Sequence, residues 1–457
     1  MSTLLVKNAD LLLTMDPPSG RIAGGGVFVR DNVIEQVGPS EGLPTDADRV
    51  FDASGMLVLP GLINTHHHLY QTLTRALPGA QDVELFAWLT RLYPVWGEMD
   101  DGAVYASALI GMAELILSGC TTTTDHLYIY PNGSSLDATI RAAQEIGIRF
   151  HPTRGSMSLG KSKGGLPPDH LVEAEAGILR DCRRVIERYH DPKPYSMLRI
   201  GLAPCSPFSV TAELMRETAA LARSSEQVTL HTHVAETLDE ERFCLEQFGA
   251  RPAEYMRRLG WVGPDVWWAH AIWLNDEEIQ MLAETGTGVA HCPSSNMRLG
   301  SGIAKIREMR DAGVRVGIAV DGSASNDGND VLLETRMALL LQRVGKGAAA
   351  FAVQEALELA TLGSAAVIGR DDLGRLAPGK AADLIGYRLD RLEFAGGAVH
   401  DPVAALLLCT AKGVDLSVIN GRVVVEDRQL LEFDLPGAIA KHDAIAAAMA
   451  ARHPLPV

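Results

Sequence analysis

The sequence has few cysteines and lacks the patterns that would place it in a membrane or outside the cell. Its 457 residues contain six cysteines, none of them in a C-x-x-C pair. Neither a disulfide framework nor a thiolate zinc site is therefore expected. No apolar run reaches 18 residues, so no membrane span is predicted. The N-terminus lacks the basic region and long apolar core of a signal peptide, and we expect a protein of the reducing cytoplasm.

The sequence also lacks an excess of basic residues. It has 41 Lys and Arg against 57 Asp and Glu, a formal net charge of −16. Nucleic acid and anionic membrane surfaces both require a basic surface on the protein, so neither is an expected partner. Hydrophobic residues make up 47% of the chain and charged residues 21%. This composition is typical of a folded globular protein with a large core.

The hydrophobic patterning predicts two kinds of structure. Short apolar stretches separated by Gly, Asp, Asn and Pro mark residues 3–58 and 381–435 as antiparallel strands. Asn420-Gly421 between β-branched runs predicts a tight hairpin. Between these ends, eight strand-like runs alternate with longer helical segments, which indicates βα units. The runs are residues 61–65, 121–125, 149–153, 198–203, 228–233, 266–270, 288–291 and 314–320.

We therefore predict an α/β fold: a (β/α)₈ TIM-like barrel over residues 59–375. Residues 1–58 and 376–457 are predicted to form one small β-sandwich domain from both chain ends, with a closing helix over 436–452. Residues 156–169 are rich in turn formers and predict a mobile loop.

Histidines gather where the predicted strands end. The active site of such a barrel lies at the carboxyl ends of its strands. Imidazoles together with a carboxylate suit a divalent metal such as Zn²⁺ or Fe²⁺. Residues i and i+2 of a strand point the same way, so His66 and His68 are predicted to share a face while His67 points away. The strand-end residues are His66, His67, His68, Asp125, His126, His231, His233, His270, His291 and Asp321.

Several motifs in a fixed order resemble the amidohydrolase superfamily, in the branch that contains guanine deaminases and triazine hydrolases. The first is the segment Leu-Pro-Gly-Leu-Ile-Asn-Thr-His-His-His that ends at His68. The resemblance covers nearly the whole chain and implies the barrel fold and a metal-dependent hydrolase. The further motifs are residues 231–236, 269–270, 291–296, 320–322 and 374–385.

The resemblance also implies the roles of individual residues. Glu236 matches the proton-shuttling Glu of the family, and His270 matches the His that stabilises the attacking oxygen. Asp321 would both ligate the metal and accept a proton from water. Binuclear relatives carry a Lys at the end of strand 4, but residues 203–208 contain none, so one divalent metal is expected, Zn²⁺ or alternatively Fe²⁺. The implied metal ligands are His66, His68, His233 and Asp321.

The substrate is expected to be a small heterocycle. Residues 78–89, 153–160 and 165–169 resemble segments of bacterial 8-oxoguanine deaminases. This implies hydrolytic deamination of an aminated oxopurine, 8-oxoguanine to urate and ammonia. The alternatives are an s-triazine or pterin amino- or chlorohydrolase, and a non-catalytic scaffold on the same barrel. The P-C-x-x-C motif of deaminases that act on nucleic-acid bases is absent. Barrels of this family also suggest a homo-oligomer.

Five residues are candidate substrate contacts. Gln71 lies at the offset of a guanine-deaminase Gln that reads an amide edge, and Cys205 ends strand 4. Trp88 and Tyr130 are expected either to stack on a flat ring or to be core aromatics. Arg154 is expected either to bind a carbonyl of the substrate or to form an ion pair with a helix.

Overall fold

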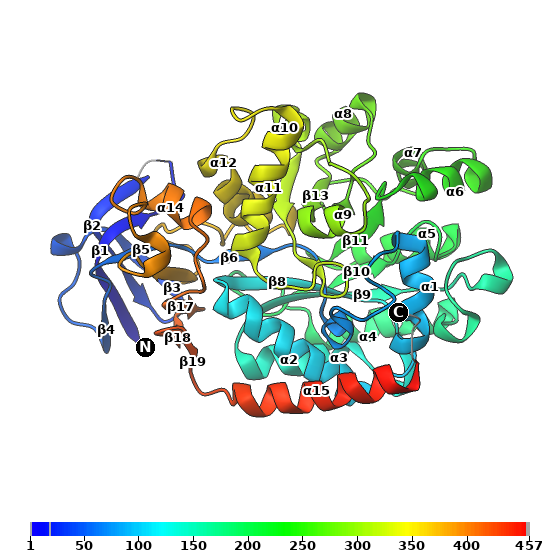
Figure 1. Cartoon of the computed structure of the whole chain (residues 1–457), viewed down its shortest axis with the longest axis horizontal. Helices are drawn as coiled ribbons and strands as arrows, with labels where there is room; N and C mark the ends of the chain where they lie inside the picture. The colour runs from blue at the N-terminus through cyan, green and yellow to red at the C-terminus, as the bar shows by residue number, and fades with distance from the viewer. Residues whose placement is uncertain (1, 18–19, 454–457) are drawn as a thin grey trace.

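In the computed structural model, which describes residues 2–17 and 20–453, eight parallel strands form a barrel sheet. The predicted barrel is confirmed (Figure 1). The two edge strands meet where Thr65 N–H donates to Ile318 O at 3.0 Å and where β7 (His67–His68) pairs with β15 (Asp321–Gly322). In sheet order the strands are β14 (Arg315–Ile318), β13 (Gly288–His291), β12 (Val266–His270), β11 (Thr229–Val234), β10 (Gly201–Pro204), β9 (Arg149–Ser156), β8 (Cys120–Leu127) and β6 (Leu62–Asn64).

Helices surround this sheet because each strand is followed by an amphipathic segment that buries one face against it. The last helix, α15, matches the helix predicted at the C-terminal end and packs on α2 (Figure 1). Within the described residues, 2–17 and 20–453, no helix is both long and apolar enough to cross a membrane. The helices are α1 (Leu85–Trp96), α2 (Asp101–Leu117), α3 (Leu136–Ile146), α4 (Glu175–Tyr189), α5 (Ala212–Arg223), α6 (Leu238–Phe248), α7 (Pro252–Arg258), α8 (Asp276–Thr285), α9 (Pro293–Arg298), α10 (Ile306–Asp311), α11 (Val331–Lys346), α12 (Val353–Glu358), α13 (Ser364–Val367), α14 (Pro402–Leu408) and α15 (Leu435–Arg452).

The two chain ends form a second, mixed sheet beside the barrel (Figure 1). Its inner side chains enclose a separate hydrophobic core. The predicted hairpin joins β17 to β18, and both turn residues, Asn420 and Gly421, have the positive φ that such a turn requires. The strands are β1 (Thr3–Leu13), β2 (Arg21–Arg30), β3 (Val33–Pro39), β4 (Arg49–Asp52), β5 (Met56–Pro60), β16 (Leu384–Arg388), β17 (Leu416–Ile419), β18 (Arg422–Glu426) and β19 (Gln429–Leu430).

The segment predicted as a mobile loop follows β9. It contains two short 3₁₀ turns, Lys161–Lys163 and Asp169–Leu171. Asp169 Oδ1 accepts from Ser162 N at 3.1 Å and so links the two turns. The mobility of this segment and the domain boundaries at residues 58–59 and 375–376 stay predictions.

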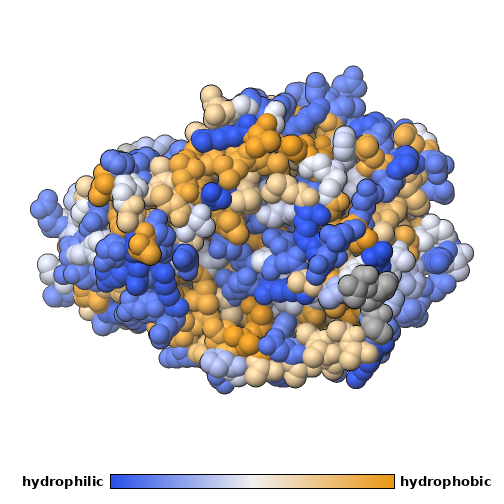
Figure 2. Space-filling view, viewed as in Figure 1, coloured by the Kyte–Doolittle hydropathy of each residue, from blue (hydrophilic) through white to orange (hydrophobic). Residues whose placement is uncertain are grey.

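Apolar surface gathers along a groove between α2 and the start of α15 (Figure 2). Leu117 of α2 and Leu435 of α15 lie on its walls, and Ile439 is 44% exposed there.

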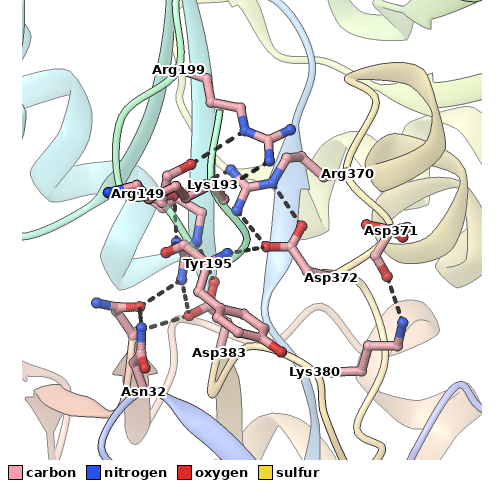
Figure 3. Close-up of polar contacts among 12 residues, drawn as sticks. Asn32, Arg149, Lys193, Tyr195, Arg199, Arg370, Asp371, Asp372, Lys380 and Asp383 are labelled. Carbon is pink, nitrogen blue, oxygen red and sulfur yellow. Dashed lines mark hydrogen bonds and ion pairs between the residues drawn. The ribbon is translucent and has the colours of Figure 1, made fainter. Parts of the chain in front are cut away.

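A buried ion-pair network joins the amino end of the barrel to the chain-end sheet (Figure 3). The Arg149 guanidinium, on β9, binds both carboxylate oxygens of Asp383 at 2.9 and 3.0 Å. It also donates to the carbonyls of Tyr195 and Ser196 and to Asn420 Oδ1. Only 1% of the Arg149 side chain is exposed. All the polar atoms of the guanidinium thus have partners, which buried charge requires.

Replacing Arg149 by Met is expected to destabilise the protein by about 3–5 kcal/mol, because Asp383 would be left as an unpaired buried charge. Urea unfolding followed by circular dichroism measures the effect. The matched control is Arg30→Met, which removes an exposed pair with Glu35 and should cost less than about 1 kcal/mol. Equal losses in the two variants would contradict the structural role of the buried pair.

Candidate active site

The strand ends bring the predicted metal ligands together at the mouth of the barrel. His66 follows β6, His68 ends β7, His233 lies on β11 and Asp321 begins β15. All four side chains are buried. His66 Nε2 lies 3.2 Å and His68 Nε2 3.4 Å from Asp321 Oδ1, and the Nε2 atoms of His68 and His233 are 3.1 Å apart. The ring of His67 is not part of the groups close enough to hold one ion.

The hydrogen bonds of His68 and His233 determine which nitrogen of each ring carries the proton. His68 Nδ1 lies 2.7 Å from the carbonyl of His126, and His233 Nδ1 lies 2.7 Å from the carbonyl of Cys205. A carbonyl only accepts, so each Nδ1 is the N–H donor. Burial lowers the pKa of both rings, that of His233 to about 3, so both are neutral. Their two Nε2 lone pairs therefore face each other with no proton between them.

The same reasoning applies to His66 through a second histidine. His231 Nδ1 donates to the Trp267 carbonyl at 3.0 Å, so His231 Nε2 must accept from His66 Nδ1 at 2.7 Å. His66 Nε2 is then a lone pair directed at the Asp321 carboxylate. Burial holds the pKa of His66 well below its usual value. Three imidazole lone pairs and one carboxylate converge here without a proton, and this donor set fits a divalent metal ion.

His126 and His231 lie at strand ends, as the sequence predicts, but their contacts give them roles that the sequence did not indicate. His231 fixes the tautomer of His66 and stacks on Trp267 at 4.5 Å. His126 Nε2 donates to the Ala203 carbonyl at 2.8 Å, and its buried Nδ1 has no partner among the described residues. It is close enough to share an ion with His66, His68 and His233. The signal in the sequence that could have identified His231 was its i, i+2 relation to His233.

Glu236 and His270 face each other beside this group. His270 Nε2 lies 3.6 Å from Glu236 Oε2 and 4.0 Å from Asp321 Oδ2. Burial raises the pKa of Glu236 to about 7, so the carboxyl exists in both protonation states near neutral pH. Burial alone would lower the pKa of His270, but the carboxylates of Glu236 and Asp321 raise it above its usual value. Asn296 Oδ1, 2.9 Å from His270 Nδ1, orients the ring.

The backbone around these residues is unusual. Ala235, His270 and Asp321 have φ values of 56°, 69° and 60°, which non-glycine residues rarely adopt. The Glu240 carboxylate accepts the N–H groups of Ala235 at 2.8 Å and of Glu236 at 2.9 Å. Such conformations persist only where surrounding contacts enforce them, and they concentrate at functional sites.

A cavity opens directly onto these groups. Three of the five candidate substrate contacts, Gln71, Trp88 and Cys205, lie on its wall. Trp88 Nε1 donates to the Ala324 carbonyl at 3.1 Å, which fixes the indole. The full lining is His68, Gln71, Leu85, Trp88, Leu89, Tyr93, Tyr128, Cys205, Ser206, Phe208, His233, Glu236, His270, Leu299, Asp321 and Ser325.

The other two candidates, Arg154 and Tyr130, are not among the residues that line this cavity. Arg154 forms ion pairs with Glu173 at 2.8 Å and with Asp181 of α4 at 2.9 Å. The Tyr130 ring lies 4.1 Å from the Arg154 guanidinium. Arg154 projects toward the helix layer because its carboxylate partners lie there. The helix-facing ion pair was the alternative that the sequence left open.

Asp125 beside the site provides a test of stability against pH. Its Oδ1 accepts from Leu69 N at 2.9 Å, and its buried Oδ2 has no partner among the described residues. Burial raises its pKa from 3.8 to about 7. Between pH 3.8 and about pH 7, Asp125 is protonated in the folded protein but ionised in the unfolded chain. The folded state therefore loses stability relative to the unfolded chain as the pH rises through this range, and the loss is complete above about pH 7.

Asp125→Asn imitates the protonated acid at every pH. Relative to that of the wild type, its free energy of unfolding should increase between pH 5 and pH 8.5, by an amount on the order of 3 kcal/mol, so the variant becomes the more stable protein at the higher pH. Urea unfolding of both proteins at the two pH values measures this difference. A difference that is independent of pH would show that Asp125 is ionised throughout.

Comparisons with known proteins agree with this geometry. The sequence pattern of the amidohydrolase family matches residues 57–424. The chain is 47% identical to the 8-oxoguanine deaminase of Pseudomonas aeruginosa, over 99% of this chain and 100% of that protein. It is 39% identical to a hydroxydechloroatrazine ethylaminohydrolase of a Pseudomonas species, over 93% and 91% of the two chains. The crystal structure of atrazine chlorohydrolase from Arthrobacter aurescens complexed with zinc superposes with a TM-score of 0.92 at 36% identity, over 97% and 100%.

Proposed function

The chain belongs to the amidohydrolase family, and from this premise we propose that it deaminates 8-oxoguanine to urate and ammonia. It is a hydrolase that acts on C–N bonds, as its deaminase relatives are, rather than a non-catalytic scaffold. The observation that carries the proposal is the convergence of three imidazole lone pairs and the Asp321 carboxylate beside Glu236, at the wall of one cavity. The substrate rests on the 47% identity to a protein named for that activity.

His66, His68, His233 and Asp321 would hold one divalent metal ion, which we propose is zinc. Neutral imidazole and carboxylate are ligands that zinc prefers, and a zinc-bound relative shares the fold. When bound, such an ion acts as a Lewis acid and lowers the pKa of a water ligand toward neutrality. The absence of a lysine from residues 203–208, which include Cys205 at the end of β10, supports a single ion.

The chain's own residues then move the protons. The attacking water gives up two protons: Glu236 accepts the first as the oxygen bonds to the ring carbon that bears the amine, and Asp321 accepts the second as that oxygen becomes a carbonyl. The N–H at His270 Nε2 donates a hydrogen bond to that oxygen and stabilises the charge that develops on it. Glu236, with its pKa of about 7, delivers the first proton to the adjacent ring nitrogen and then passes the second, taken up by Asp321, to the leaving amine. Ammonia leaves and the ring carbon becomes a carbonyl.

The rest of the cavity suits a flat, polar heterocycle. The Gln71 amide both donates and accepts hydrogen bonds, which matches the N–H and C=O edge of an oxopurine. Its Oε1 accepts from Ala324 N at 3.3 Å, and this contact holds the side chain at the wall. Trp88 supplies an aromatic surface and Cys205 a small, polarisable side chain.

A substrate panel tests this proposal against the triazine and pterin alternatives. The metal-loaded protein is assayed on 8-oxoguanine, guanine, isoxanthopterin, hydroxyatrazine and atrazine, with ammonia release and ultraviolet spectra as readouts. We expect the highest kcat/KM on 8-oxoguanine. A higher kcat/KM on a triazine or a pterin would overturn the oxopurine assignment while leaving the metal site intact.

Two finer features complete the proposal. We propose that the enzyme works in the reducing cytoplasm, because its six cysteines are all unpaired in the structure. We also propose that it is a homo-oligomer, since the apolar groove between α2 and α15 leaves Ile439 44% exposed (Figure 2). Sedimentation at micromolar concentration tests the second point, and a monomer mass would contradict it.

A further inference from the structure

Two leucines separate the catalytic cavity from a second cavity nearer the surface. Leu85, the first residue of α1, and Leu299, the residue that follows α9, line both cavities. Their exposed fractions are 7% and 4%. Among the described residues, these two alone line both cavities. The two leucines therefore form the boundary between an inner and an outer cavity.

The outer cavity, here called the vestibule, differs in chemistry from the boundary. Its walls carry charged and hydroxyl groups together with two partly exposed apolar side chains, Leu238 at 48% and Trp273 at 38%. Trp273 Nε1 donates to the Ser301 carbonyl at 2.8 Å, so the indole is fixed. The lining is Glu84, Leu85, Thr237, Leu238, Asp239, Arg242, Trp273, Leu299, Gly300 and Ser301. The vestibule can hydrogen-bond a hydroxylated group, whereas the two leucines between it and the catalytic cavity cannot.

We infer that Leu85 and Leu299 form a hydrophobic gate that selects the free purine base against its N9-glycosylated nucleosides. The inference rests on the proposed function, because it assumes that an aminated oxopurine occupies the inner cavity. The carbon that bears the amine must lie against Glu236 and His270, in the six-membered ring. The five-membered ring, which carries N9, is then directed toward the cavity mouth.

A sugar on N9 would have to lie between the two leucines. Its hydroxyl groups would lose water there without gaining hydrogen bonds, which is unfavourable. The leucine side chains would also have to move from positions where each is packed and almost fully buried. A free base leaves the gate closed, and its apolar rim then excludes water from the reacting groups. Truncation of the leucines should join the two cavities and let the sugar reach the polar wall of the vestibule.

The experiment compares 8-oxoguanine with its N9-ribosyl nucleoside as substrates of the zinc-loaded enzyme. The variants are Leu85→Ala, Leu299→Ala and the double variant, with Leu85→Val and Leu299→Val as milder changes if the alanine variants fold poorly. Leu245→Ala is the matched control, since Leu245 is a 47% exposed leucine of α6 that lines neither cavity. Thermal unfolding of each variant confirms that it is folded.

We expect the wild type to deaminate the base and to show little activity on the nucleoside. In the double variant the ratio of kcat/KM for base to that for nucleoside should fall by more than tenfold, and in Leu245→Ala it should not change. A wild type that deaminates both equally, or a ratio unchanged in the folded double variant, would overturn the gate.

Failure of the proposed function gives a different result, namely a wild type that is inactive on both compounds. In that case the gate is tested on the compound of the panel that is turned over, with a small and a bulky ring substituent. The same fall in the ratio is expected, and its absence counts against the gate.

Discussion

Replacing Glu236 by Gln is expected to lower kcat by about 10²–10⁴-fold while the bound metal remains. The amide has the same shape but neither accepts nor delivers a proton at neutral pH. Glu236 lies on the cavity wall, faces His270 at 3.6 Å and is not among the donors that converge on the metal position. Its pKa of about 7 allows it to take a proton and return it within one turnover.

Steady-state kinetics together with metal analysis of the same samples measure this effect. Glu246→Gln is the matched control, because Glu246 is an exposed residue of α6. It should retain both kcat and metal. A Glu236→Gln enzyme with near-normal kcat would show that another group transfers the proton. Loss of the metal from this variant would show instead that Glu236 is a ligand.

The second large effect is expected when either of two nearby histidines, His66 or His68, is replaced, but not when His67 between them is replaced. His66→Gln and His68→Gln should each lower the affinity for the metal by more than about 100-fold, since even changes in the residues that hold a ligand cost about 10–100-fold. Deamination should fall with the metal content. His67→Gln should keep the metal, because the His67 ring is not among the groups close enough to share one ion.

Metal analysis after dialysis against a weak chelator, followed by readdition of zinc, measures these affinities. The three variants differ by one position each along the chain, so a general loss of structure would affect them alike. Only the alternation of side chains along a strand predicts that the middle variant behaves differently. Retention of metal by His68→Gln, or its loss from His67→Gln, would contradict the ligand assignment.

The arrangement of the strand ends could be predicted from the sequence because it depends on local periodicity. Eight apolar runs that alternate with longer helical segments predict the barrel, and the barrel places whatever follows each strand at one mouth. His66, His68 and His233 are found together for this reason. Asn420-Gly421 predicted its hairpin equally well, because the turn requires two residues that tolerate positive φ.

The contacts between distant segments could not be predicted in this way. The proton positions on the ligands depend on the carbonyls of Cys205 and Trp267, which periodicity does not identify as partners. Arg154 lies on the barrel strand β9, yet its side chain pairs with Asp181 of α4 and with Glu173, which lies just before that helix. The role of Asn296 as partner of His270 depends on a distance that no spacing in the sequence gives.

The most direct test of the central claim is the mass of the product formed in ¹⁸O-labelled water. The zinc-loaded enzyme is incubated with 8-oxoguanine, and urate and ammonia are measured in the same reaction. We expect each urate molecule to carry one solvent-derived oxygen and one ammonia to be released for each urate formed. Urate without the label, or consumption of 8-oxoguanine without ammonia, would contradict hydrolytic deamination at this site.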